Sequence, residues 1–180
     1  DGWAVRILVR DRRKISGQPW ADSVDVVEGN ANSFQDLERA LTGVHTAYYL
    51  LHSINAGTQF DEVEAEMAKN FADASSKCGV SQIIYLGGIA NDENRSKHLA
   101  SRMNTGAILG AGTVPVMELR AGIIIGSGSA SFEMLRHLTH RLPIMTTPKW
   151  VSNRTQPIGI RDVLYYLRQC AQLPTPINQV

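Results

Sequence analysis

The sequence predicts one α/β domain in which a mainly parallel, doubly wound sheet is covered by helices on both faces. Three observations indicate this class. Short β-branched, apolar runs recur along the 180 residues, stretches with helical spacing separate them, and the strands are apolar on both faces. A chain of this length can form one core that buries about 70% of its unfolded surface.

Two strands precede the first helix. AVRILVR (4–10) and SVDVVEG (23–29) are apolar runs bounded by charge or glycine, which is typical of strands. A helix is expected between Asn32 and Gly43, with Asn32 or Ser33 as its N-cap and the glycine as its stop. Its apolar face consists of Phe34, Leu37 and Leu41.

The alternation continues through the middle of the chain. TAYYLLHS (46–53) predicts a strand, and a long helix ending at Gly79 follows it. QIIYLGG (82–88) predicts the next strand, and SKHLASR (96–102) lies in the helix after it. The apolar stripe of the long helix consists of Phe60, Val63, Met67, Phe71 and Ala74.

The last third predicts a strand within 114–126 and then an amphipathic helix. Residues 143–157 carry three prolines and little periodicity, so we expect an irregular excursion. A final helix is expected from Asp162, as its N-cap, to Ala171, before an extended segment at 175–180. The apolar positions of the amphipathic helix are Phe132, Leu135, Leu138 and Leu142.

Charge and cysteine content narrow the class of protein. Eighteen basic and seventeen acidic residues give a net charge of +1, so no global field favours nucleic acid or an anionic membrane. No apolar run spans a membrane and no signal-peptide pattern opens the sequence, so we expect a cytoplasmic protein. Cys78 and Cys170 are expected to be buried thiols. A homo-oligomer is compatible with the sequence.

The first strand resembles the second strand of a dinucleotide-binding unit. Such a unit begins with a strand that enters a glycine-rich turn, which holds the pyrophosphate, and nothing like it precedes residue 4. Because that strand lies centrally in the sheet order 3-2-1-4-5-6, its absence leaves two apolar strand edges unpaired. We therefore expect residues 1–180 to be a single domain from a longer chain, or the strand to be supplied otherwise.

The order and spacing of several motifs resemble the atypical short-chain dehydrogenase/reductases. The similar members are NmrA-like and nucleotide-sugar-epimerase-like proteins that bind NAD(P) in a Rossmann fold. The resemblance spans nearly the whole chain. It is carried by VRILVRD (5–11), VVEGNANSFQDLERALTGVHTAYYLLHS (26–53), IIYLGG (83–88), HLASR (98–102), VPVMELRAGIIIGSGS (114–129) and QPIGIRDVLYYL (156–167).

The resemblance assigns the adenosine end of the cofactor to the first two strands. Arg10 would bind the ribose or its 2′-phosphate, which favours NADP over NAD because a guanidinium binds phosphate through two hydrogen bonds. A solvated arginine is the alternative, and Arg12 or Arg13 could serve instead. Asn30 and Ala31 would lie beside the adenine, although Asn30 is equally well explained as a helix-capping residue.

The resemblance also assigns residues to the remaining length of the cofactor. His52 departs from the small residues common in the family, and Gly87 and Gly88 stand where catalytic members carry a serine. These further cofactor-binding candidates are Leu50, Leu51, His52, Leu86, Gly87, Gly88, Arg102, Ala121, Gly122 and Ile123.

Catalytic members carry Tyr-x-x-x-Lys where this sequence has His98 and Arg102. Histidine can exchange protons near neutral pH, and arginine can hold ribose hydroxyls but cannot deprotonate. Three alternatives stay open: ligand contact without chemistry, catalysis, and a solvated helical turn. In the third, Ser96, Lys97, His98, Ser101 and Arg102 face water and Leu99 and Met103 face the sheet.

The sequence thus predicts a protein that binds a dinucleotide, NADP or NAD, and an unidentified small molecule. An NADPH-dependent oxidoreductase is one hypothesis. A non-catalytic NADP(H)-sensing regulator or assembly factor is the alternative, and a nucleotide-sugar epimerase or dehydratase is a further one. No metal site is expected, since His137 and His140 have no further ligands at suitable spacing. The glycine-rich turn at 126–129 is either an anion site or a plain loop.

Overall fold

The strands form three parallel groups in the computed structural model, which describes residues 2–51, 60–89, 97–126, 130–141 and 156–180. Strands β1 (Arg6–Val9) and β2 (Asp25–Glu28) pair with each other. Strands β3 (Thr46–Tyr49), β4 (Gln82–Gly88) and β5 (Val116–Ala121) form the main sheet, in that order. The short strands β6 (Ile124–Ile125) and β7 (Ile158–Gly159) form the third group.

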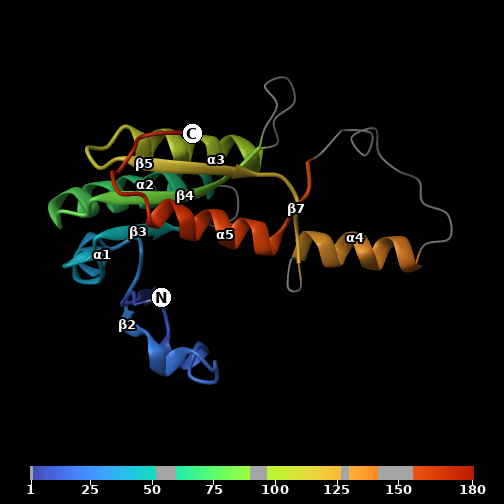
Figure 1. Ribbon diagram of the computed structural model, residues 1–180, viewed down its shortest axis with the longest axis horizontal. Coiled ribbons are helices and arrows are strands. Elements are labelled where there is room, and N and C mark those ends of the chain that lie inside the picture. Colours follow the sequence, from blue (N-terminus) through green and yellow to red (C-terminus); the bar gives the residue numbers. More distant parts are fainter. Residues whose placement is uncertain (1, 52–59, 90–96, 127–129, 142–155) are drawn as a thin grey trace.

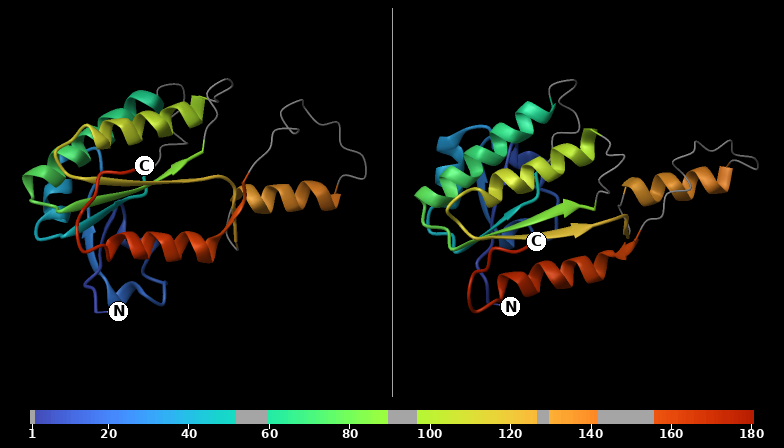
Figure 2. Two further views of the ribbon diagram at one scale, coloured as in Figure 1. Left: turned by 45° about the horizontal axis from the view of Figure 1, so that its top comes forward. Right: turned by 90° about the horizontal axis from the view of Figure 1, so that it is seen from above.

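Helices cover both faces of the main sheet (Figure 1). Helix α1 (Phe34–Leu41) joins β2 to β3, while α2 (Phe60–Lys77) and α3 (Lys97–Gly110) lie side by side on one face. Helix α5 (Ile160–Ala171) lies on the opposite face, as the view from above shows (Figure 2). Helix α4 (Ala130–Arg141) extends away from the sheet. These layers confirm the α/β class with parallel strands that the sequence predicts.

The hydrophobic core is divided by the sheet into two clusters. The larger one lies under α1, α2 and α3, and Ile83 and Tyr85 of the central strand are fully buried in it. The smaller one joins the sheet to α5 through Ile84 and Met117, which pack on Val163 and Leu167. Alternate residues of β4 thus enter opposite clusters, as expected for a strand with two covered faces.

β1 and β3 each expose one edge that pairs with no described strand. The carbonyls of Val5 and Val9 accept hydrogen bonds from the β2 side, so the backbone groups of Arg6 and Leu8 face away from β2. Likewise, the His45 carbonyl accepts a bond from the β4 side. The backbone groups of Thr46, the first residue of β3, therefore face away from β4.

Apolar side chains beside these edges are unusually exposed. They are Val5, 50% exposed, Tyr48, 40%, Leu50, 54%, and Leu51, 37%. The two unpaired apolar edges that the sequence predicts are therefore present in the described residues.

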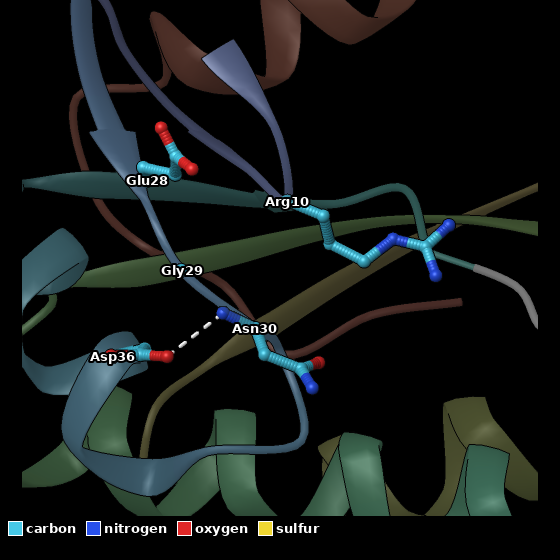
Figure 3. A pocket seen from close by; sticks show the side chains of 5 residues that line it. All are labelled: Arg10, Glu28, Gly29, Asn30 and Asp36. Carbon is cyan, nitrogen blue, oxygen red and sulfur yellow. Dashed lines mark hydrogen bonds between the residues drawn. The ribbon is translucent and has the colours of Figure 1, made fainter.

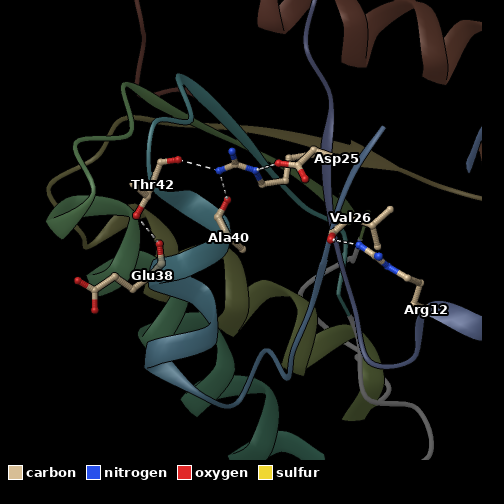
Figure 4. A network of polar contacts seen from close by, with 7 residues as sticks. Arg12, Asp25, Val26, Glu38, Ala40 and Thr42 are labelled. Carbon is tan, nitrogen blue, oxygen red and sulfur yellow. Dashed lines mark hydrogen bonds and ion pairs between the residues drawn. The ribbon is translucent and has the colours of Figure 1, made fainter. Parts of the chain in front are cut away.

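Arginine side chains attach the β1–β2 pair to its neighbours (Figure 4). Arg6 Nε donates to the Asp25 carboxylate at 2.6 Å, and its Nη1 donates to the carbonyls of Ala40 and Thr42 at 3.2 and 2.7 Å. Arg12 Nη2 donates to the Val26 carbonyl at 2.7 Å. Polar bonds from β1 to the end of α1 therefore hold this strand pair.

Several local predictions are confirmed. Ser33 is the N-cap of α1, since its hydroxyl accepts the Asp36 N–H at 3.3 Å. Gly43 and Gly79 take positive φ angles of 74° and 71° after α1 and α2, which only glycine adopts without strain. The C-terminal segment is extended, and Gln179 bridges in parallel to Met117 of β5.

Other predictions are wrong. Helix α5 begins two residues before Asp162, with Gly159 as its N-cap, because the short β7 leads directly into it. The strand expected within 114–126 divides into β5 and β6. Cys170 is buried as expected, but Cys78 is only half-buried because it lies in the last turn region after α2.

Candidate functional site

An open depression of about 420 Å³ lies where β1 and β2 end (Figure 3). Arg10 follows β1, and Glu28, Gly29 and Asn30 lie at the end of β2, with Asp36 from the first turn of α1 beneath them. The carboxyl ends of parallel strands are the usual place for ligands in doubly wound sheets. The structure therefore brings two of the predicted cofactor residues, Arg10 and Asn30, into one depression.

Asp36 fixes the backbone of this turn. Its Oδ2 accepts the Asn30 N–H at 2.9 Å, and a Cβ at Gly29 would lie 2.8 Å from the Asp36 Cβ. The Asn30 backbone bond, followed by the Arg39 side-chain bond, holds the pKa of Asp36 below its ordinary value. Only glycine at position 29 allows this close approach.

Asn30 does not cap α1, which uses Ser33. Its Oδ1 instead accepts the Asn32 N–H at 3.1 Å, and its side-chain amide donors have no partner among the described residues. In Figure 3 the Asn30 side chain points away from Asp36 and toward the side on which the Arg10 side chain extends. This arrangement leaves hydrogen-bond donors available to a ligand.

Among the arginines of the basic run 10–14, Arg10 has the guanidinium that remains free to bind a ligand. Arg12 is bonded to the Val26 carbonyl, and Arg13 forms an ion pair with Asp11 at 2.9 Å. Arg10 is exposed, and within the described part of the chain it makes no hydrogen bond or ion pair. Of the three arginines considered from the sequence, Arg10 is the one whose guanidinium makes no bond to the described residues.

The other candidates of the adenosine side follow β2 and β3. Ala31 packs against the larger core cluster. Leu50 and Leu51 directly follow β3 and are exposed. His52 lies outside the described residues.

A second group of candidates lies at the carboxyl end of β4. The Arg102 guanidinium donates to the Leu86 carbonyl and stacks over the Tyr85 ring, 5.7 Å from its centroid. The Tyr85 hydroxyl in turn donates to the Arg102 carbonyl at 2.9 Å. A Cβ at Gly88 would lie 3.2 Å from the Leu99 side chain, so α3 approaches the strand closely here.

The solvated-turn alternative for this helix is wrong in part. Ser101 is 5% exposed, and its hydroxyl donates to the buried Glu64 carboxylate of α2 at 2.5 Å. Arg102 is half-buried because its side chain follows the face of Tyr85. His98 lies in the first turn of α3, and its side chain is outside the described part of the structure.

The remaining candidates end β5 beside this group. Ala121 pairs with Gly88, and its carbonyl accepts the Ile89 N–H at 3.0 Å. The Ile123 carbonyl accepts the Ile158 N–H at 3.0 Å. Gly122 lies between Ala121 and Ile123, which are both half-buried. The structure thus places Gly87, Gly88 and Ala121 along one edge of the sheet.

Sequence reasoning missed an ion pair with a buried carboxylate next to this edge. Glu118 and Arg120 alternate with apolar residues in β5, and the Glu118 side chain is only 5% exposed. The signal was a glutamate and an arginine two residues apart within the apolar run VMELRAG, together with Gly106 inside a helix.

Within the described residues, no cluster of histidine, cysteine, aspartate or glutamate could hold a metal ion. Among the helices that the structure describes, none is long and apolar enough to cross a membrane.

The chain matches the family model described as NAD(P)H-binding over residues 1–113. No curated protein matches it.

Solved structures share the fold at low sequence identity. Triphenylmethane reductase of Citrobacter sp., complexed with NADP(H), has a TM-score of 0.58 and 22% identity over 75% of this chain and 45% of its own. The Bordetella bronchiseptica enzyme WbmG, in complex with NAD and UDP, has a TM-score of 0.72 and 16% identity over 99% of this chain and 64% of its own. ChuY, an anaerobillin reductase from Escherichia coli O157:H7, has a TM-score of 0.66 and 15% identity over 98% of this chain and 82% of its own.

The chain spans less than two thirds of the first two of these structures. At these identities the likeness shows a common Rossmann-like fold.

Proposed function

Because the chain belongs to the NAD(P)H-binding family, we propose that it binds NADP(H) along the carboxyl ends of its strands as an atypical short-chain dehydrogenase/reductase and reduces a small molecule. One observation carries this proposal: the free guanidinium of Arg10 and the free amide donors of Asn30 line the same open depression. A phosphate needs the first group and an adenine the second.

The residues present fit the adenosine end of a dinucleotide. The Asp36 bond to the Asn30 N–H fixes the turn, and Gly29 lets the backbone lie close to α1. Arg10 supplies a fork for a 2′-phosphate, which NADP carries and NAD lacks. These groups support NADP(H) as the preferred cofactor.

The nicotinamide end is proposed at the carboxyl end of β4. When bound there, the cofactor supplies a hydride to the substrate. Gly87 and Gly88 end this strand, where their missing side chains make room for Glu118 and Leu99, and Arg102 lines this edge with its guanidinium. We assign proton exchange with the substrate to His98, which lies one helical turn before Arg102 in the sequence of α3.

We further propose that the unpaired edges of β1 and β3 receive one more parallel strand, carried by a longer form of the chain. Arg6 and Leu8 on one side and Tyr48 on the other present backbone groups that such a strand could bond. Its following turn would reach the carboxyl edge between the two candidate areas, where a pyrophosphate would lie.

A non-catalytic NADP(H) sensor is the second candidate function. It is favoured by Gly87, which offers no hydroxyl to a substrate, and by Arg102, whose guanidinium is bonded to the Leu86 carbonyl. Both residues can still contact a ligand, so this alternative keeps the same binding site.

Calorimetric titration with NADPH and NADH tests the binding site, on the 180-residue chain and on a longer chain that carries the additional strand and turn. Arg10→Gln is expected to weaken NADPH binding by about tenfold or more and to leave NADH nearly unchanged. The matched control is Arg13→Gln, which removes an exposed arginine that is already paired with Asp11. No affinity for either dinucleotide, or an equal loss for both in Arg10→Gln, would contradict the proposal.

Turnover distinguishes the enzyme from the sensor. With NADPH and a panel of carbonyl compounds, oxidation of NADPH that falls strongly in His98→Phe supports the reductase. NADPH binding without turnover in the unaltered protein supports the sensor instead.

A further inference from the structure

Arg120 is oriented by a buried carboxylate. Its Nε donates to Glu118 Oε1 at 2.8 Å and its Nη2 to Oε2 at 3.3 Å, so the two groups meet side by side. The Glu118 side chain is 5% exposed, whereas that of Arg120 is 38% exposed. The pair therefore has a buried, fixed end and an end that reaches solvent.

Two glycines make room for this carboxylate. A Cβ at Gly106 of α3 would lie 2.6 Å from Glu118 Oε2, and a Cβ at Gly87 of β4 would lie 2.8 Å from Oε1. No side chain larger than hydrogen fits at either position without moving Glu118. The closely fitted space holds Glu118 in place, and Glu118 in turn fixes the direction of the guanidinium.

A guanidinium has five N–H groups that form two forks, and Glu118 uses only the fork made by Nε and Nη2. Within the described residues, the other donors of Arg120 have no partner. An arginine that is charged, held in one orientation and left with a free fork is suited to bind a second planar group with two oxygens.

This fork lies at the proposed reaction end of the site. Arg120 pairs with Gly87 in the β4–β5 register, and its side chain lies on the face that carries Glu118, Tyr85 and α3. We infer that the free fork of Arg120 binds a carboxylate group of the second ligand, so that the substrate is a small carboxylic acid. This inference rests on the proposed function for the identity of the reaction end.

The surrounding charges agree with a single carboxylate. Arg102 is a second cation near this edge, and it is bonded to the Leu86 carbonyl and stacks over the Tyr85 ring. Glu118 neutralises Arg120 from the buried side, and Glu64 of α2 is bonded to Ser101 of α3. A ligand carboxylate at the free fork would complete a carboxylate–guanidinium–carboxylate arrangement with Arg102 nearby as a second positive charge.

Benzoate is the probe, with benzamide as its neutral counterpart of the same shape. Saturation-transfer NMR is used to measure their dissociation constants with the full chain, with and without saturating NADPH. Benzoate is expected to bind about tenfold more tightly than benzamide, and Arg120→Lys is expected to weaken benzoate about tenfold because an ammonium cannot keep both bonds. NADPH affinity is measured in the same samples and is expected to stay within about twofold.

A second variant guards against misfolding, since removing Arg120 alone leaves Glu118 buried and unpaired. The double variant Glu118→Gln/Arg120→Gln keeps a neutral hydrogen bond and is expected to lose the preference for benzoate. The matched control Arg136→Gln removes an arginine paired with Glu133 on α4, and it is expected to bind benzoate as the unaltered protein does.

The outcomes separate this inference from the proposed function. Equal binding of benzoate and benzamide, or benzoate affinity that is unchanged in Arg120→Lys, overturns the carboxylate site while leaving NADPH binding as it is measured. If NADPH does not bind but benzoate binding still depends on Arg120, the carboxylate site stands and the proposed function falls.

Discussion

The main sheet and the β1–β2 pair are parallel structures of the same chain, yet they are held in different ways. In the main sheet, β4 lies between two strands and under helices on both faces, and Ile83 and Ile84 are fully buried. In the β1–β2 pair the apolar residues of both strands are at most half-buried. Besides Leu8, which packs against the larger core cluster, arginine bonds to the carbonyls of Ala40 and Thr42 attach this pair to the end of α1.

This difference indicates that the two halves of the proposed site are stabilised to different degrees. The candidate reaction end, with Gly87 and Arg102, rests on the buried sheet. The candidate adenosine end, with Arg10 and Asn30, rests on the less buried pair. Since local stability follows buried apolar contact, the adenosine end should open more readily than the reaction end.

The largest expected effect comes from the same substitution in the two regions. Ile83→Ala should lower the free energy of unfolding by about 2–5 kcal/mol, because Ile83 is fully buried and a cavity would remain. Ile7→Ala, in half-buried β1, should cost about 1 kcal/mol or less. Urea denaturation measures both.

The same two substitutions can also contradict the proposed difference between the two regions. An Ile7→Ala cost equal to that of Ile83→Ala would mean that the β1–β2 pair is as firmly packed as the main sheet in solution. The difference between the two regions would then be absent.

Substitution of Arg6 is expected to have an intermediate effect on the free energy of unfolding. Arg6→Met removes the bonds to Asp25, Ala40 and Thr42, and because these groups are partly exposed the cost should be about 1–2 kcal/mol. The loss should be local. Hydrogen exchange of the Asp25 and Gly29 amides, which bond to β1, should accelerate, while that of Ile83 should not change.

Arg13→Met is the matched control, because the Arg13 guanidinium pairs with Asp11 of its own turn and with no other described residue. Equal acceleration of the Ile83 amide in Arg6→Met would show that β1 and the main sheet open together. That result would contradict the independence of the two regions.

The sequence predicts the elements of this fold well because hydrophobic spacing is a local property. The alternation of strands and helices, the Ser33 cap and the glycine stops all depend on neighbouring residues. The start of α5 was misplaced because an aspartate within the first turn satisfies the same local preference as a cap, and the position of β7 decides between them.

The candidate site was only partly predictable for a related reason. A family pattern pointed to Arg10 and Asn30, but only the structure shows that Arg12 and Arg13 are already bonded. Glu118 and Arg120 were missed because the burial of Glu118 depends on Gly87 and Gly106, which come from two other elements. The two-residue spacing of Glu118 and Arg120 puts both on one face of β5, but it does not show that glycines of two other elements bury the carboxylate.

The smallest expected effect sharpens the comparison at the turn that joins β2 to α1. Hydrogen bonds from the Asn30 backbone and Arg39 hold the pKa of Asp36 below its ordinary value of 3.8. Because the folded pKa is the lower one, the stabilisation is present above pH 3.8 and is lost as the pH falls through the folded pKa. In an NMR titration, the Asn30 amide should shift with a midpoint below pH 3.8, while the amides of β4 stay unchanged.

Asp36→Asn should abolish that transition and leave the free energy of unfolding of the main sheet unchanged. A midpoint at or above pH 3.8 would mean that the Asp36 bonds to Asn30 and Arg39 do not persist in solution. The turn that lines the depression would then not be held in one conformation.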